Sequence, residues 1–86
     1  MITMTRTPII SQLGEILDRV TMGRIKPAQV RETSRVFDDL GMSSLELLEL
    51  RFDIESAWNV TLEDHDLPRM QVVRDVIDLI VERAAA

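Results

Sequence analysis

The sequence predicts an all-α fold, and two observations carry this prediction. Apolar residues recur at the spacing of an amphipathic helix, every three or four residues, in three segments, 8–22, 44–58 and 71–83. Residues that readily adopt the left-handed conformation follow the first two segments, Gly23 after one and Asn59 after the other. We therefore expect helices joined by loops.

The first helix is expected from Pro8 to about Met22. Thr7 followed by Pro8 is a favourable start, because proline lacks an N–H that would have no partner at the first helical position. Gly14 inside the helix costs about 1 kcal/mol relative to Ala, which the close approach of another helix would explain. The residues expected on its core face are Ile9, Ile10, Leu13, Ile16, Leu17 and Val20.

A long connection, residues 23–41, follows the first helix. Loops of this length are uncommon in a small domain unless they pack on themselves or are functional. Residues 27–30 are expected to form a single helical turn, and Arg31 and Arg35 are expected to be solvated. The apolar residues expected to anchor the connection are Ile25, Val30, Val36, Phe37 and Leu40.

The second helix has the clearest start in the chain. Ser43 stands at the N-cap position and Glu46 follows three residues later, which is the pattern of a capping box. Met42 and Leu47 occupy the two positions of a hydrophobic staple. The helix is therefore expected to begin at Ser44, with this serine fixed and exposed at its entry.

The second helix, Ser44–Trp58, is apolar on more than one side. One stripe fits the core, a second apolar stripe is rotated away from it, and an acidic stripe runs alongside the second. The second stripe is either ordinary core or a partly exposed docking strip rimmed by acids, and periodicity leaves this open. The three stripes are Leu47, Leu50, Ile54 and Trp58; Leu45, Leu48 and Phe52; and Glu46, Glu49 and Asp53.

Two further elements are expected near the C-terminus. A short acidic turn at 63–67 is expected to stop at Pro68, and a last helix is expected from Gln71 to Arg83. Adjacent apolar residues at 72–73 break the alternation of a strand there. His65, the single histidine, is expected to be solvated rather than a metal ligand or a catalytic base, so we predict no catalytic and no metal-binding residues.

Composition bounds the class of protein. Eighty-six residues with 45% hydrophobic content fit one small domain, 1–86. The absence of cysteine excludes disulfides, thiolate metal sites and a cysteine nucleophile, and suits a reducing cytoplasm. The N-terminus lacks the pattern of a signal peptide and no stretch has the length of a membrane span. We expect a soluble, cytoplasmic monomer that does not bind membranes.

The acidic residues are concentrated in the middle of the chain. The net charge is −5, but residues 38–66 contain nine acids against one base, Arg51. Such a surface repels nucleic acid and attracts basic protein surfaces. We therefore expect no nucleic-acid partner and expect protein partners that present Arg and Lys.

The segment Asp38–Leu45, DDLGMSSL, resembles the acidic-Asp-Leu-Gly-x-Asp-Ser-Leu signature of the acyl carrier protein family. The order of the expected elements is similar to that family over roughly residues 8–83. The resemblance implies a four-helix bundle with a long first loop and a short third helix. It also implies that Ser44 bears 4′-phosphopantetheine, and that the chain is a carrier and not an enzyme.

The resemblance further implies the partners. They are a phosphopantetheinyl transferase and acyl-loading or acyl-transferring enzymes with basic docking surfaces, which recognise the second helix. The cargo is a thioester, and fatty-acyl, polyketide and aminoacyl or peptidyl cargoes stay open because these carriers share the serine-helix signature. Residues implied to bind partners are Leu45, Glu46, Leu48, Glu49, Phe52 and Asp53; those expected to shelter an apolar chain are Leu48, Phe52, Leu62 and Leu67.

One position departs from the family signature. The family usually has Asp before the modified serine, and this chain has Ser43. Both residues are strong N-caps, so the local fold is expected to survive while one negative charge is lost. The departure gives some weight to an alternative function, an unmodified acidic helical module that binds a basic partner.

Overall fold

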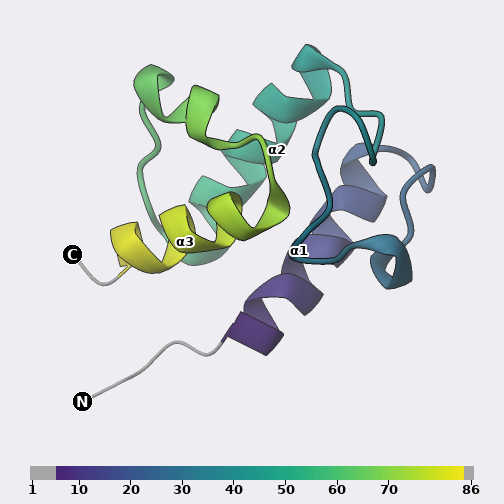
Figure 1. Cartoon of the computed structure of the whole chain (residues 1–86). Coiled ribbons are helices and arrows are strands. Elements are labelled where there is room, and N and C mark those ends of the chain that lie inside the picture. Colours follow the sequence, from purple (N-terminus) through teal and green to yellow (C-terminus); the bar gives the residue numbers. More distant parts are fainter. Residues whose placement is uncertain (1–5, 85–86) are drawn as a thin grey trace.

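The computed structural model describes residues 6–84 and is all-helical, which confirms the predicted fold class. Three α-helices, α1 (Arg6–Val20), α2 (Ser44–Trp58) and α3 (Val73–Ala84), enclose one core. Two short 3₁₀ helices, η1 (Pro27–Gln29) and η2 (Asp64–Arg69), lie in the connections. Figure 1 shows the long connection beside α1, and η2 between the end of α2 and the start of α3.

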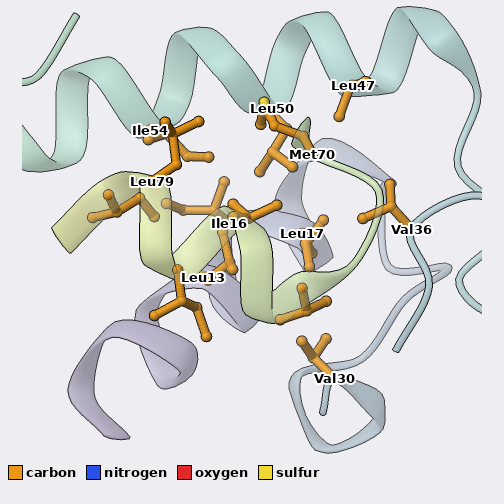
Figure 2. Close-up of a cluster of buried hydrophobic side chains, with 14 of the residues drawn as sticks. Leu13, Ile16, Leu17, Val30, Val36, Leu47, Leu50, Ile54, Met70 and Leu79 are labelled. Atoms are coloured by element: carbon orange, nitrogen blue, oxygen red, sulfur yellow. The ribbon is translucent and has the colours of Figure 1, made fainter. Parts of the chain in front are cut away.

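The core forms where the apolar faces of the three α-helices meet (Figure 2). On α1 the buried face is rotated slightly from the expected one, because Ile9 and Ile16 are buried while Ile10 and Val20 are half-buried. On α3 the sequence pattern missed Leu79, which is fully buried. The side chains with 1% exposure or less from the three helices are Leu13, Leu17, Leu50, Ile54, Val73, Val76, Ile77, Leu79 and Ile80.

Helix α1 ends in a turn that uses two left-handed residues. Met22 (φ 55°) and Gly23 (φ 85°) both have positive φ. The Gly23 N–H donates to the Asp18 carbonyl at 2.8 Å, and the Met22 N–H donates to the Arg19 carbonyl at 3.2 Å, which is the pattern of a Schellman motif. The helix therefore ends at Val20, earlier than the predicted Met22, and the left-handed conformation begins one residue before the predicted Gly23.

The connection between α1 and α2 packs across the bundle. Four of its five predicted anchors, all except the half-buried Phe37, are buried. The predicted single turn is η1, and its Pro27 explains Gly14: a Cβ on Gly14 would lie 3.1 Å from Pro27 Cα. The connection is also tied to the start of α3, because the Val36 N–H donates to the Gln71 carbonyl at 2.9 Å.

The segment between α2 and α3 is held by polar groups from both helices. Helix α2 ends at Trp58, where Asn59 adopts the predicted left-handed conformation (φ 53°, ψ 49°). Element η2 continues through Pro68 to Arg69, although the sequence predicted a stop at Pro68. The fixed φ of proline suits a 3₁₀ helix and only one N–H is lost, which accounts for the difference.

No helix between residues 6 and 84 has the length and apolar character needed to cross a membrane.

Candidate functional site

The start of α2 is fixed by the predicted capping box. The Glu46 N–H donates to Ser43 Oγ at 3.1 Å, and the Ser43 N–H donates to Glu46 Oε1 at 2.9 Å. Ser43 has the extended backbone of an N-cap (φ −87°, ψ 167°). Both positions of the predicted staple, Met42 and Leu47, are buried in the core. The entry to the helix is therefore held by hydrogen bonds on the outside and by apolar packing on the inside.

Ser44 is the first residue of α2, and its side chain is exposed. The first bond along the helix runs from the Leu47 N–H to the Ser43 carbonyl at 3.0 Å, and the Glu46 N–H is taken by Ser43 Oγ. Within residues 6–84 the N–H groups of Ser44 and Leu45 accordingly have no protein acceptor. The hydroxyl of Ser44 thus stands in solvent at the positive end of a helix dipole.

Sequence reasoning missed Arg24, which holds this site from the α1–α2 connection. Its Nη1 donates to the carbonyls of Leu40 at 3.0 Å and Gly41 at 3.1 Å, while Nη2 pairs with the Glu46 carboxylate. These contacts join residues 16 to 22 positions apart, so no local pattern indicates them. The hydrogen bond from the Ser43 N–H, followed by that from Arg24, lowers the pKa of Glu46 below its usual range.

The second apolar stripe of α2 lies on the surface, which decides the question that the sequence left open. Leu45 and Phe52 are 65% and 64% exposed, and Leu48 is 39% exposed. We call these three residues the α2 strip. Large apolar side chains gathered in solvent on one helix are typical of an interaction surface.

The three acids beside the α2 strip differ in their availability. Glu49 is exposed, and no ion pair of its side chain is found among the described residues. Asp53 is paired with Arg19 of α1 at 3.5 Å. Glu46 is used within the site by Ser43 and Arg24. Of the predicted acidic stripe, Glu49 is therefore the acid most available to a partner.

The four residues expected to shelter an apolar chain differ in their burial. Leu62 is buried at 1% exposure and Leu67 is half-buried, whereas Leu48 and Phe52 face solvent. Leu62 therefore belongs to the core and Phe52 to the surface in this structure. That these four residues shelter an apolar chain carried by the protein stays a prediction.

His65 and Asp66 lie next to one another in η2 but differ in exposure. The imidazole of His65 is 77% exposed, as predicted for a solvated histidine. Across residues 6–84 no three His, Cys, Asp or Glu side chains are grouped as metal ligands. Sequence reasoning did not find the ion pair in which the half-buried Arg83 donates two hydrogen bonds, both 2.7 Å long, to the buried Asp66.

Similarity to known proteins identifies the family of this chain. Residues 11–80 match the family model described as the phosphopantetheine attachment site. The chain is 33% identical over 79 residues to an acyl carrier protein from Thermotoga maritima, covering 92% of this chain and 95% of that protein. The chain belongs to the acyl carrier protein family. Members of this family are carriers rather than catalysts, and the prosthetic group is 4′-phosphopantetheine.

Two further acyl carrier proteins match at similar identity. One from Rhodococcus erythropolis is 33% identical over 76 residues, covering 88% of this chain and 81% of the relative. The meromycolate extension acyl carrier protein of Mycolicibacterium smegmatis is 34% identical over 76 residues, covering 88% and 75%. These relatives support acyl carrier function in fatty-acid or related biosynthesis, and favour it over an unmodified interaction module.

The residues at the start of α2 fit a phosphodiester. Ser44 offers an exposed hydroxyl that is not used by the capping box, since Ser43 is the cap. The unbonded N–H groups of Ser44 and Leu45 and the helix dipole favour negative charge at this position. The acid of the capping box, Glu46, is paired with Arg24, which reduces its repulsion of a phosphate on Ser44.

Proposed function

We propose that this acyl carrier protein bears its 4′-phosphopantetheine on Ser44 and presents fatty-acyl-type thioesters to partner enzymes. The observation that carries the proposal is the exposed Ser44 hydroxyl at the first position of a capped helix, inside the matched phosphopantetheine attachment region. The fatty-acyl assignment is supported by the relatives, one of which is named for meromycolate extension. When bound, the group supplies the thiol that forms the thioester.

The chain itself contributes position rather than chemistry. The capping box and Arg24 hold the first turn of α2 in one conformation, so the attachment point is fixed relative to the docking surface. A fixed attachment point with a long arm keeps the cargo at high effective concentration near the active site of a docked enzyme. We further propose that residues 1–86 act as a single-domain monomer in the cytoplasm, which the absence of cysteine suits.

Docking is proposed to use the α2 strip together with Glu49 and Asp53. The exposed apolar side chains supply area that a partner can bury, and the acids beside them favour a basic partner. A phosphopantetheinyl transferase would have to approach the same surface, because Ser44 lies at its edge. The side chain of Glu46 supports this surface from within by holding the helix start.

The attachment site is tested by mass spectrometry. The parent and Ser44→Ala are incubated with a phosphopantetheinyl transferase and coenzyme A, and intact masses are measured. The parent should gain one phosphopantetheinyl group and Ser44→Ala should gain none. Ser43→Ala is the matched control, because it removes the neighbouring hydroxyl and should still be modified. Modification of Ser44→Ala, or tandem spectra that place the group on Ser43, would refute the assignment.

The docking surface is tested by association kinetics with the same transferase. Glu49→Lys should slow association several-fold at low ionic strength, and the difference should shrink as salt is added. Glu15→Lys on α1 is the matched control, since Glu15 is also exposed and the change in net charge is equal. Equal association rates for the two variants would show that net charge alone, and not this surface, controls the encounter.

A further inference from the structure

A small groove lies between the α1–α2 connection and the start of α3. Its volume is about 180 Å³, and it is lined by Arg35, Phe37, Asp38, Gln71 and Val72. We call it the Phe37 groove. Figure 1 shows the two segments that form it beside one another, the connection before α2 and the link that enters α3.

The floor of the groove is rigid. Arg35 and Val72 form an antiparallel bridge, flanked by the hydrogen bonds from Val36 N–H to the Gln71 carbonyl and from Val73 N–H to the Ser34 carbonyl, both 2.9 Å long. Residues directly opposite in such a bridge project to the same side. The Arg35 and Val72 side chains therefore stand together at the groove.

The lining combines apolar surface with an amide and has no net charge. Phe37 and Val72 are half-buried, so they leave part of their apolar surface open. Of the lining residues, Arg35 and Asp38 carry opposite charges 3.7 Å apart, and Arg35 also pairs with Asp39 at 3.4 Å. Gln71 is exposed, and its side-chain amide makes no hydrogen bond with the described residues. Such a lining suits a neutral chain in which amides alternate with short methylene segments.

Backbone hydrogen bonds hold the groove close to the segment that leads into Ser44. The Gly41 N–H donates to the Phe37 carbonyl at 3.0 Å, and the Met42 N–H donates to the Val36 carbonyl at 3.2 Å. Met42 precedes Ser44 by two residues, and Val36 is the chain neighbour of the lining residue Phe37, so the backbone of Phe37 lies within roughly 16 Å of Ser44. The pantetheine arm, with about a dozen bonds between phosphorus and sulfur, extends as far as about four residues of backbone, roughly 15 Å.

We propose that the Phe37 groove holds the distal, amide-bearing part of the pantetheine arm carried by Ser44 of the same chain. This inference rests on the proposed attachment to Ser44. The methylene segments of the arm contact Phe37 and Val72, and an arm amide hydrogen-bonds the Gln71 side chain. With a volume of about 180 Å³, the groove accommodates a short part of the arm.

The test is nuclear magnetic resonance of the labelled protein before and after modification, with mass spectrometry to establish that modification is complete. Conversion to the modified form should shift the amide signals of Phe37, Asp38, Gln71 and Val72 as well as those around Ser44. Nuclear Overhauser effects should connect the distal methylene groups of the arm to the Phe37 ring and the Val72 methyl groups. Shift changes confined to residues 42–48 in fully modified protein would overturn the proposal without affecting the attachment site.

Two variants distinguish binding of the arm in the Phe37 groove from general effects of modification or charge. Gln71→Glu removes the amide donor and adds a negative charge to the groove that Asp38 also lines. It should abolish the chemical-shift changes and the Overhauser contacts at Phe37 and Val72, while Ser44 is still modified. Gln12→Glu is the matched control, because Gln12 is exposed on α1 and the charge change is identical. Val72→Thr keeps the shape but adds a hydroxyl, and should weaken the same effects. Contacts that persist in Gln71→Glu, or that appear only after an acyl chain is loaded, would refute the proposal.

Discussion

The ion pair of the buried Asp66 with the half-buried Arg83 gives the sharpest prediction about stability. Asp66 is 1% exposed and is the one buried charged residue between residues 6 and 84. Two hydrogen bonds from Arg83 and one from the Glu63 N–H, between 2.7 and 2.8 Å long, hold its carboxylate. The pair connects η2 to α3, so it fixes the segment that closes the bundle beside α2.

The contribution of this ion pair to the free energy of unfolding follows from the pKa of Asp66. Arg83 lowers this pKa from 3.8 to about 2, against the opposing effect of burial. This lower pKa in the folded state corresponds to roughly 2 kcal/mol of free energy of unfolding at neutral pH. The contribution is complete above the unfolded-state pKa near 3.8 and disappears as the pH falls through about 2. For a domain of this size the loss corresponds to about 10 °C in the melting temperature.

The perturbation is Asp66→Asn, which keeps the size of the side chain and removes its charge. Urea unfolding of the parent and the variant at pH 7, 5, 3 and 2 should give a difference of roughly 2 kcal/mol at pH 7 and 5 that shrinks towards pH 2. Asp64→Asn is the matched control, because Asp64 also pairs with an arginine at 2.7 Å but is 95% exposed. That variant should lose less than about 1 kcal/mol.

Two outcomes would refute this reasoning. If Asp66→Asn costs no more than Asp64→Asn, burial does not strengthen the Asp66 pair. If the difference between the parent and Asp66→Asn stays constant from pH 5 to pH 2, the loss comes from packing and not from the charge of the carboxylate.

Two further predictions concern the ends of α2. Ser43→Ala should lower the stability by about 1 kcal/mol, because the Glu46 N–H loses its acceptor, whereas Ser43→Asp should be nearly neutral in thermal unfolding. A large loss of stability in Ser43→Asp would mean that the cap does not tolerate a carboxylate beside Glu46. Asn59 holds φ 53° at the other end, so Asn59→Ala should cost about 1 kcal/mol and Asn59→Gly should cost less, which the same unfolding measurement checks. Equal losses for both changes at Asn59 would show that its side chain, and not its backbone conformation, matters.

Features that depend on neighbouring residues were predictable from the sequence. The capping box of Ser43 and Glu46 involves residues three positions apart, and the left-handed Asn59 depends on its own side chain and backbone. The existence of the three α-helices followed from periodicity for the same reason. The ends of the elements were predicted less accurately. The left-handed turn after α1 includes Met22 as well as Gly23, and η2 continues through Pro68.

Features that depend on distant residues were not predictable. Arg24 and Glu46 are 22 positions apart, and Asp66 and Arg83 are 17 apart, so nothing in a local pattern selects these partners among the other charged residues. The exposure of the α2 strip was undecided for a related reason. Both apolar stripes of α2 suit a core, and only the positions of α1 and α3 determine which of them is covered.

The internal contacts of α2 determine which substitutions can report on partner docking. Glu46 accepts the Ser43 N–H and pairs with Arg24, so reversing its charge would disturb the attachment site as well as the surface potential. Reversing Asp53 would also remove its pair with Arg19 of α1. Within residues 6–84 Glu49 makes no such internal contact, so its reversal changes the surface charge alone and reports directly on electrostatic steering. Because rim charges mainly change association rates while buried apolar contacts change dissociation rates, Glu49→Lys should act on association and Phe52→Ala on dissociation of the same complex.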